Sequence, residues 1–326
     1  MQKHPYRRVG QWLELHPADL LGGQGKDSDS TQQTELISIP EAGSHPHLLR
    51  QWLLARSVFP AKWINRLFSV GGIRWEGEAI RLLAFPAVDP AADPLYCKAQ
   101  NNKDDVQVLY EDDFCLVMNK PAGMPVHESY SGQTGTLDQA AAHWLLKAGD
   151  PVLVRHIHRL DDDTSGPVLY AKNDLAQWVL DEAMREKRID RRYLAIVHGK
   201  LTKSSGTIRA SIGKDRHHSS RRMVTPSGDT AVTHFEAVQT YPQVSLVRLQ
   251  LETGRTHQIR VHMSHIGHPL VGDKLYGGDS RLLLHQALHG ERLIFPHPWT
   301  GEMVQVQAPE PVWLMSLLDK LAGRTN

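Results

Sequence analysis

Cysteine is scarce in this chain, which has only Cys97 and Cys115 among its 326 residues. Their spacing matches neither a metal-ligand motif nor a redox motif, which argues against a disulfide framework and a thiolate metal centre. We therefore expect free thiols and a reducing, cytoplasmic setting. The chain also lacks a run of about 18 apolar residues, which excludes a transmembrane helix and a membrane partner. The N-terminus holds no uninterrupted apolar stretch, so we do not expect a signal peptide.

A strong net charge is lacking as well, since the formal charge is only +1, but the charges are unevenly distributed. Between Arg185 and Arg222, twelve Lys and Arg residues stand against three Asp and Glu residues. Such an excess attracts a phosphate backbone, and Arg216, Arg221 and Arg222 are candidate contacts. The alternative is a solvated helix face followed by a loop.

The composition, 40% hydrophobic and 22% charged, fits a globular protein with a sizeable core. Residues 1–46 are interpreted as an N-terminal extension and loop, because 22–46 are rich in Gly, Ser, Asp and Gln. Residues 47–88 predict two helices and a hairpin around Glu76–Gly77, and this order resembles an S4-like RNA-binding module. A small capping domain without RNA contact is the alternative. Residues 89–105 hold prolines and polar residues, as a linker does.

The remaining segment, 106–326, mixes strands and helices without regular βαβ alternation. Apolar or alternating runs predict strands over VQVLY, FCLVMNK, RYLAIVHG, TAVTHFEAVQTY and VSLVRLQLE. Helices are predicted over TGTLDQAAAHWLLKA and NDLAQWVLDEAMREKR, the latter capped by Asn173 or Asp174. The pattern indicates an α+β domain with a mixed, largely antiparallel central sheet.

One polar turn lies between two apolar strands within residues 152–170, VLVRHIHRLDDDTSGPVLY. Polar side chains at a strand end can project into a cleft from a rigid support. Asp161 in this turn could act as a nucleophile or a base. The same cluster, with His156, His158 and three consecutive aspartates, could instead hold a divalent metal, or it could simply be solvated.

The segment HRLDDDTSG at 158–166 resembles the signature of the RluA-type pseudouridine synthases, namely HRLD, two variable residues and TSG. Further segments resemble motifs of the same family in the same order. These are DDFCLVMNKPAGMPVH, RRYLAIVHG, AVTHFEAV, LETGRTHQIRVHMSHIGHPLVGDKLYG and LLLHQ. The resemblance covers about residues 105–310 and implies the pseudouridine synthase fold for 106–326.

The resemblance implies catalytic roles for three residues. Asp161 corresponds to the essential catalytic aspartate, and Tyr193 to the active-site tyrosine, whose ring can stack on a uracil. Arg260 corresponds to the arginine paired with the aspartate, and a guanidinium fork can hold a carboxylate bidentately. Without the resemblance, Tyr193 would be interpreted as a core tyrosine and Arg260 as part of a structural salt bridge.

The resemblance also implies a set of substrate-binding residues. Arg159 would replace the flipped base in the RNA stack or bind a phosphate, and Leu284 would pack beneath the base. The full predicted set comprises His158, Arg159, Thr164, Arg255, His257 and Leu284. A metal site formed by His257, His262 and His265 is not expected, because the family motif already accounts for these residues.

The implied activity is isomerisation of specific uridines to pseudouridine in ribosomal or transfer RNA. The C1′–N1 bond breaks, the uracil rotates, and C5 takes the place of N1, so no cofactor is implied. Asp161 could attack C1′ or remove the C2′ proton to give a glycal. We expect a monomer. A metal-dependent hydrolase and an RNA-binding protein with a decayed site are the competing hypotheses.

Overall fold

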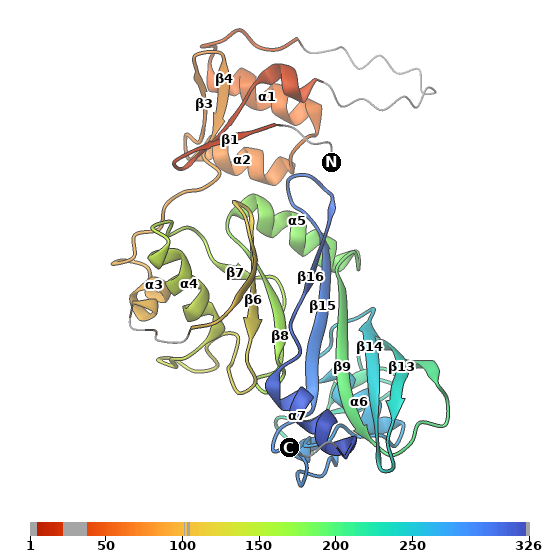
Figure 1. Ribbon diagram of the computed structural model, residues 1–326. Helices are drawn as coiled ribbons and strands as arrows, with labels where there is room; N and C mark the ends of the chain where they lie inside the picture. Colours follow the sequence, from red (N-terminus) through yellow and green to blue (C-terminus); the bar gives the residue numbers. More distant parts are fainter. Residues whose placement is uncertain (1–4, 22–37, 101, 103–104, 324–326) are drawn as a thin grey trace, which may run out of the picture.

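The computed structural model describes residues 5–21, 38–100, 102 and 105–323. A small N-terminal unit sits at one end of a larger body that contains two sheets side by side (Figure 1). The described part of the chain contains no helix long and apolar enough to cross a membrane.

The N-terminal unit is a four-stranded antiparallel sheet with two helices. The strand order is β1 (Arg7–Val9), β2 (Trp12–Leu15), β4 (Ala79–Leu82) and β3 (Ile73–Glu76). The helices are α1 (Pro46–Arg56) and α2 (Ala61–Ser69), preceded by a 3-10 turn, η1 (Pro17–Leu20). The two helices and the hairpin occur where the sequence predicts them.

The N-terminal segment departs from the expected extension. Leu13 of β2 pairs with Leu82 of β4, so residues 7–15 complete the sheet of the 73–82 hairpin. Leu13 and Leu15 are fully buried in the shared core, which explains why this short segment folds. A boundary at residue 46 therefore does not separate these strands from the unit. Most of the predicted loop, residues 22–37, lies outside the described residues.

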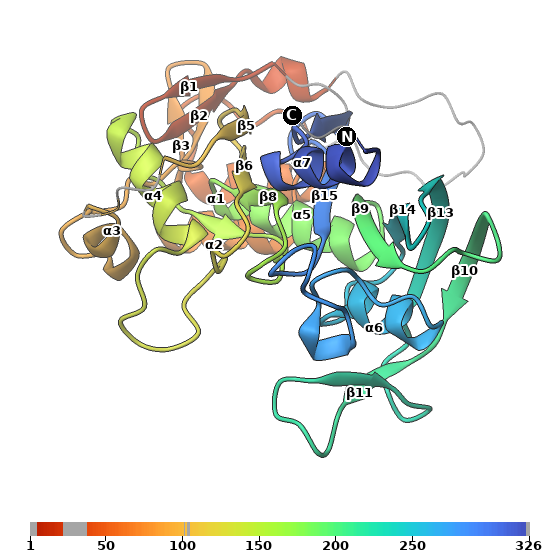
Figure 2. The same cartoon turned by 60° about the horizontal axis from the view of Figure 1, so that its bottom comes forward.

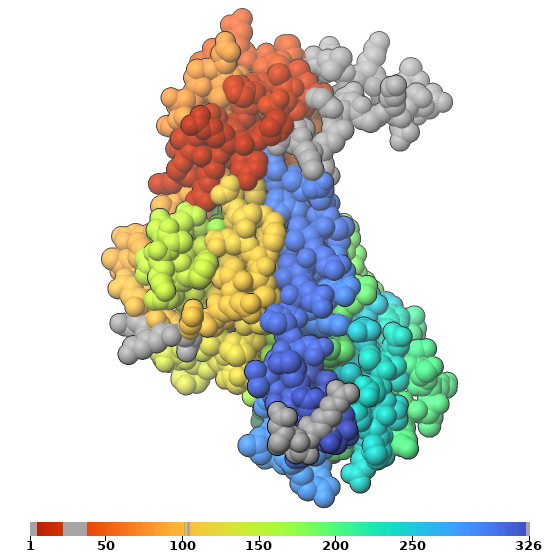
Figure 3. Space-filling view, in the orientation of Figure 1, coloured from red at the N-terminus to blue at the C-terminus, as the bar shows by residue number. Residues whose placement is uncertain are grey.

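The N-terminal unit packs onto the body through aromatic side chains. Tyr6 meets the edges of Phe114 and Trp299, with ring centroids 5.4 and 5.1 Å away, and Phe114 stacks on Trp299 at 5.4 Å. Phe59 and Phe85 contact the same group. In the space-filling view the N-terminal residues (red) lie directly against the yellow and blue segments (Figure 3). The two units therefore share one hydrophobic core.

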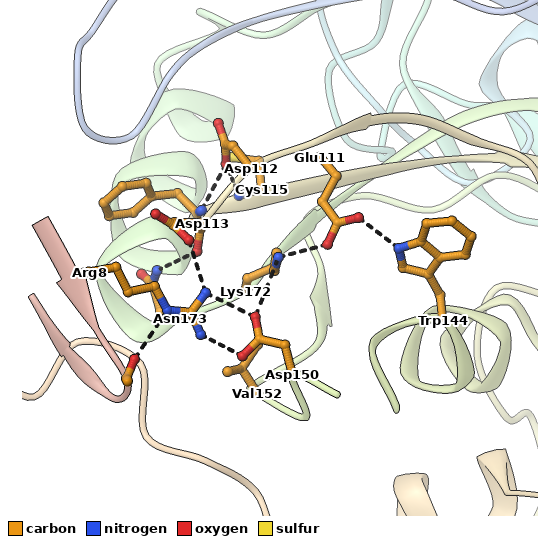
Figure 4. Close-up of polar contacts among 12 residues, drawn as sticks. Arg8, Glu111, Asp112, Asp113, Cys115, Trp144, Asp150, Val152, Lys172 and Asn173 are labelled. Carbon is orange, nitrogen blue, oxygen red and sulfur yellow. Dashed lines mark hydrogen bonds and ion pairs between the residues drawn. The ribbon is translucent and has the colours of Figure 1, made fainter. Parts of the chain in front are cut away.

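Charged side chains form ion pairs at the edge of this interface (Figure 4). The Arg8 guanidinium on β1 donates to Asp113 Oδ1 at 2.9 Å and to both carboxylate oxygens of Asp150, at 2.5 and 2.9 Å. It also lies over the Phe85 ring, 4.5 Å from the centroid. Next to it, the buried Lys172 ammonium donates to Glu111 at 2.8 Å. The interface thus combines apolar packing with paired charges.

The predicted linker contains a helix. Asp93 caps α3 (Pro94–Ala99) by accepting from the backbone N–H groups of Leu95 and Tyr96. Tyr96 and Ala99 are buried against Ala142 of α4 (Leu137–Lys147). This segment is therefore packed onto the body.

The body is built from antiparallel strand pairs. One four-stranded sheet has the order β5 (Val108–Glu111), β6 (Cys115–Lys120), β8 (Gly166–Ala171) and β7 (Arg155–His156). The six-stranded sheet has the order β10 (Ser205–Arg209), β13 (Val232–Thr240), β14 (Val244–Leu251), β9 (Asp190–His198), β15 (Leu288–Pro296) and β16 (Met303–Gln307). A separate hairpin pairs β11 (Ile212–Lys214) with β12 (Arg222–Val224).

Helices complete the body and make it an α+β fold, as predicted. They are α4, α5 (Asp174–Arg185), α6 (Gln258–His265) and α7 (Val312–Leu321), with a 3-10 turn η2 (Lys274–Tyr276). Asn173 caps α5 by accepting from Ala176 N at 2.8 Å, in agreement with one of the two predicted caps. Side chains from both sheets and from α6 form one core cluster in the body.

Candidate active site

The turn that carries Asp161 lies where the two sheets of the body meet. Ser165 forms a parallel bridge with His289 of β15, and Gly290 N donates to Ser165 O at 2.7 Å. Gly166 has a φ of +128°, and a Cβ there would lie 2.6 Å from the Gly290 backbone. Only glycine fits this close approach. The junction of the sheets therefore fixes the position of the turn.

A buried lysine binds the backbone of this turn. Lys120, at the end of β6, donates from Nζ to the carbonyl oxygens of Asp162, Met124 and Pro121 at 2.5, 2.6 and 2.9 Å. Burial lowers the pKa of Lys120 to about 8, although the carboxylates of the turn oppose this shift. Sequence reasoning did not single out Lys120. The available signal is a lysine in a strand whose other residues are mostly buried.

Arg260 on α6 holds Asp161, but not with the expected geometry. Its Nη1 donates to Asp161 Oδ2 at 2.9 Å. Its Nε and Nη2 donate to the two oxygens of Asp273 at 2.7 and 2.9 Å. The bidentate partner is therefore Asp273, and the predicted fork on Asp161 is wrong. Asp273 was not predicted, and its side chain is only 1% exposed. The Arg260 guanidinium is therefore shared by two carboxylates, Asp161 and Asp273.

The electrostatics of Arg260 follow from these contacts. Burial by itself lowers the pKa of Arg260, but the hydrogen bond to Asp273 and the charges of Asp273 and Asp161 outweigh it, so the net pKa is raised. Arg260 is therefore a permanent cation shared by two carboxylates. A cation at this distance favours the ionised form of Asp161.

His257 lies near the same oxygen of Asp161 that accepts from Arg260. Its Nε2 is 3.9 Å from Asp161 Oδ2, and its Nδ1 is 2.8 Å from the hydroxyl of Tyr276. Burial lowers the pKa of His257, and the charge of Arg260 adds to this effect, while that of Asp161 opposes it. The imidazole is therefore neutral near pH 7. Tyr276, which sequence reasoning missed, also places its ring 5.1 Å from the Arg260 guanidinium carbon.

Two adjoining cavities open beside Asp161. The larger, about 330 Å³, is lined by Asp161, His257 and Arg260 together with Arg159 and His127. The smaller, about 70 Å³, also contains Asp161 in its wall. Its other lining residues include Thr164, Tyr193, Arg255, Gln258, Ile259 and Leu288. Residues far apart in the sequence thus converge on one carboxylate.

Tyr193, on β9, is 5% exposed and lines the smaller cavity. Burial raises the pKa of Tyr193, and the charge of Asp161 adds to the shift, although Arg191 opposes it. The side chain is therefore a neutral phenol near neutral pH. Its ring can face a planar group next to Asp161.

Three of the predicted substrate-binding residues lie around the cavities. Arg159 is exposed, and its Nη2 makes a long contact of 3.5 Å to Thr256 Oγ1. Arg255 donates from Nε to the carbonyl of Thr230 at 3.1 Å. Thr164 is buried, and its hydroxyl oxygen lies 3.4 Å from Gln286 Nε2.

Two predicted substrate contacts are placed elsewhere. His158 is buried outside both cavity walls, and its Nε2 accepts from Leu169 N at 3.3 Å. Burial lowers its pKa to about 3, so it is a neutral core residue. Leu284 is 80% exposed and lines neither cavity. The apolar part of the smaller cavity is instead formed by Leu160, Leu251, Ile259 and Leu288.

The last part of the basic stretch, from residue 212 on, lies in a hairpin next to the site. Strands β11 and β12 project from the body near α6 (Figure 2), and Arg216 lies in the exposed loop between them. Next to the loop of the hairpin, Arg222 N donates to the Tyr276 hydroxyl at 2.9 Å. The Arg221 guanidinium carbon lies 5.7 Å from the centre of the Tyr276 ring. The hairpin therefore contacts Tyr276, which in turn contacts His257 and Arg260.

The histidines of the 251–277 motif do not converge. His262 is fully buried, with its ring nitrogens 2.8 Å from Thr233 Oγ1 and 2.8 Å from Ala210 O. His265 is exposed on α6, whereas His257 faces Asp161. Among the described residues, no three His, Cys, Asp or Glu side chains are grouped as metal ligands.

The known proteins that this chain resembles belong to one family. Residues 114–265 match a family described as RNA pseudouridylate synthase. The chain is 48% identical over 215 residues to the uncharacterized RNA pseudouridine synthase YhcT of Bacillus subtilis, covering 65% of this chain and 71% of that one. It is 38% identical over 231 residues to the ribosomal large subunit pseudouridine synthase D of Pseudomonas aeruginosa, covering 66% and 72%.

A solved structure shows the same fold. The human RNA pseudouridylate synthase domain containing 1 superposes with a TM-score of 0.56 at 28% identity, covering 65% of this chain and 86% of that one. The motif order, the sheet architecture and the sequence identity all lead to one assignment. This chain belongs to the RluA-type RNA pseudouridine synthases and is an isomerase that acts on uridine in RNA.

Proposed function

We propose that Asp161 is the catalytic carboxylate of this isomerase, with Arg260 as its ionic partner and Tyr193 as the residue facing the base. The observation that carries this proposal is a partly exposed carboxylate at the junction of two cavities, 2.9 Å from a buried guanidinium. The cation favours ionised Asp161, whose side chain is 25% exposed in the walls of the two cavities.

The chemistry needs a carboxylate at the ribose and a wall for the uracil. Asp161 attacks C1′ or removes the C2′ proton, and in both routes the C1′–N1 bond breaks and the uracil rotates before C5 bonds to C1′. Tyr193 can hold the uracil through its ring, since stacking on an aromatic side chain contributes about 1–3 kcal/mol per base. The target uridine must be flipped out of its stack to reach the cavities.

The proposed substrate is ribosomal RNA of the large subunit. Relatives named ribosomal large subunit pseudouridine synthase D, at 35–39% identity, support this choice. Transfer RNA is the alternative. Mapping pseudouridines in total RNA from a deletion strain against its parent identifies both the RNA and the uridine.

The RNA backbone is proposed to follow the β11–β12 hairpin, with Arg216, Arg221 and Arg222 as phosphate contacts. Replacing all three by Gln should weaken RNA binding and reduce the slope of log affinity against log salt by about 0.7 per lost contact. Coincident slopes for the two proteins would show that the hairpin is not on the RNA path.

The same proposal gives different roles to the two parts of the chain. Residues 106–326 carry out the chemistry as a monomer, and the N-terminal unit, including the S4-like segment 47–88, helps to select the RNA. The basic side chains exposed on this unit, Lys62, Arg66 and Arg74, support an RNA-facing role.

Asp161→Asn is the direct test, because it keeps the size of the side chain and removes its charge. Turnover on total ribosomal RNA from the deletion strain should be abolished, while the unfolding curve should remain close to that of the wild type. Asp162→Asn removes a neighbouring charge from the same turn, so comparing the two variants isolates the role of Asp161. Substantial turnover by folded Asp161→Asn protein would refute the assignment.

A further inference from the structure

His257 adopts a left-handed backbone conformation at the start of α6. It stands at the start of α6 with a φ of +57°, one of three non-glycine residues with positive φ among the described residues. For a residue with a side chain this left-handed conformation costs about 1–2 kcal/mol. The side chain also makes no capping hydrogen bond to the helix. Helix formation therefore does not explain why a histidine stands here.

The imidazole is oriented instead by Tyr276. The Tyr276 oxygen accepts a hydrogen bond from Arg222 N at 2.9 Å, and its other polar neighbour is His257 Nδ1 at 2.8 Å. A phenol that already accepts from a backbone N–H best uses its own proton as a donor to that ring nitrogen. This assigns Nδ1 as the acceptor and places the single imidazole proton on Nε2.

The Nε2–H group then points toward the catalytic carboxylate but is not used by it. Nε2 lies 3.9 Å from Asp161 Oδ2, which is longer than a hydrogen bond. His257 lines both cavities beside Asp161. Among the residues that the structure describes, none accepts a hydrogen bond from this Nε2, so the neutral donor is available to a substrate.

We propose that His257 is a further catalytic residue, whose Nε2–H donates a hydrogen bond to the uracil as it leaves C1′. This inference rests on the proposed role of Asp161. When the C1′–N1 bond breaks, its electron pair goes to the uracil, and the negative charge spreads over N1 and the carbonyl oxygens. This holds whether Asp161 attacks C1′ or removes the C2′ proton. The hydrogen bond stabilises the anion without transferring a proton, so the bond balance of the isomerisation is unchanged.

The neighbouring cation already uses three of its five N–H groups. Nε and Nη2 of Arg260 each donate to Asp273, and Nη1 donates to Asp161. A neutral imidazole also has an advantage, because it adds no charge that would hold the Asp161 carboxylate back from C1′. Lowering of the His257 pKa by burial agrees with this neutral form.

The test compares His257→Asn with His265→Asn. Asparagine tolerates positive φ, so the first variant keeps the backbone conformation while removing the ring. His265 is an exposed histidine on the same helix and lines neither cavity. The substrate is an RNA fragment carrying the mapped target uridine, or the same fragment with 5-fluorouridine at that position. Fluorine stabilises the uracil anion, so bond breaking then depends less on a hydrogen-bond donor.

We expect His257→Asn to slow the single-turnover rate on uridine by about 100-fold, as is typical for loss of one donor to a developing anion. RNA affinity should be unchanged, and the defect should be much smaller on 5-fluorouridine. His265→Asn should behave as the wild type on both RNAs. An equal defect on both RNAs, a defect in affinity alone, or no defect would each overturn the proposal.

A measurement on the wild-type protein tests the assignment without any variant. Nitrogen-15 NMR of the imidazole should show His257 protonated at Nε2 and unprotonated at Nδ1, and protonation at Nδ1 would overturn the proposal. Asp161→Asn in the same kinetic assay separates the two hypotheses. If that variant is active, the proposed function fails. If it is inactive while His257→Asn is normal, only the role of His257 fails.

Discussion

Replacing Gly166 by alanine should strongly destabilise the protein, because two costs coincide at this position. A Cβ would lie 2.6–2.7 Å from the N, Cα and O atoms of Gly290, all of which are backbone and cannot rotate away. Overpacking typically costs about 1–3 kcal/mol. The φ of +128° adds about 1–3 kcal/mol for a residue with a side chain. The free energy of unfolding should therefore fall by about 2–6 kcal/mol, which is a large part of a total of about 5–15 kcal/mol.

Gly149→Ala is the matched control for this prediction. Gly149 has a φ of +71°, but a Cβ there meets no atom within 4 Å. Its replacement should cost only the left-handed conformation, about 1–2 kcal/mol. Urea unfolding followed by fluorescence and circular dichroism gives both values. If Gly166→Ala loses no more stability than Gly149→Ala, the close contact between the sheets is not what requires glycine at 166.

Three further predictions concern charged and titrating groups in and around the site. Arg260→Lys should lower the single-turnover rate by about 100-fold, because one ammonium cannot reproduce one contact with Asp161 together with two contacts with Asp273. Near-normal turnover would show that a point charge suffices. Asp273→Asn should lower the free energy of unfolding, measured with urea, by about 3–5 kcal/mol, because it breaks a buried ion pair. An unchanged urea midpoint would contradict this. His158 has a folded pKa of about 3 against an ordinary value of 6.5, so the unfolded state binds the extra proton between these pH values. Stability should therefore fall as the pH drops from 6.5 toward 3, and this fall should be shallower in His158→Gln; identical pH profiles would exclude the contribution of His158.

Local patterns in the sequence were sufficient for much of the fold. Apolar periodicity predicted α1, α2, α4 and α5, and alternation predicted β9, β13 and β14. Helix α3 was missed because prolines suggested a linker, although Asp93 followed by Pro94 is a good helix start. Helix α6 was not predicted, since it is short, polar on several faces and preceded by a residue with positive φ. The pairing of β2 with β4 depends on a long-range contact that local patterns do not reveal.

The sequence also predicted part of the candidate site. Motif resemblance brought Asp161, Tyr193 and Arg260 together, and the structure places all three around the same cavities. Asp273 could not be assigned, because its contact with Arg260 depends on the path of the loop after α6. The exposure of Leu284 likewise depends on loop geometry that the motif does not encode. Pattern resemblance thus identified the chemistry, whereas three-dimensional packing determined how each group is held.

The docking of the N-terminal unit through Tyr6 and Arg8 has a consequence for how the molecule can be divided. A fragment beginning after residue 100 would expose Phe114 and Trp299, which are 0% and 3% exposed in the intact chain. It would also leave Asp113 and Asp150 without the guanidinium that lies between them. The N-terminal unit therefore covers apolar side chains of the catalytic body and neutralises two of its carboxylates. The unit and the body should melt in a single cooperative transition, so exchanging this unit between relatives would require the underlying aromatic and acidic residues to be exchanged with it.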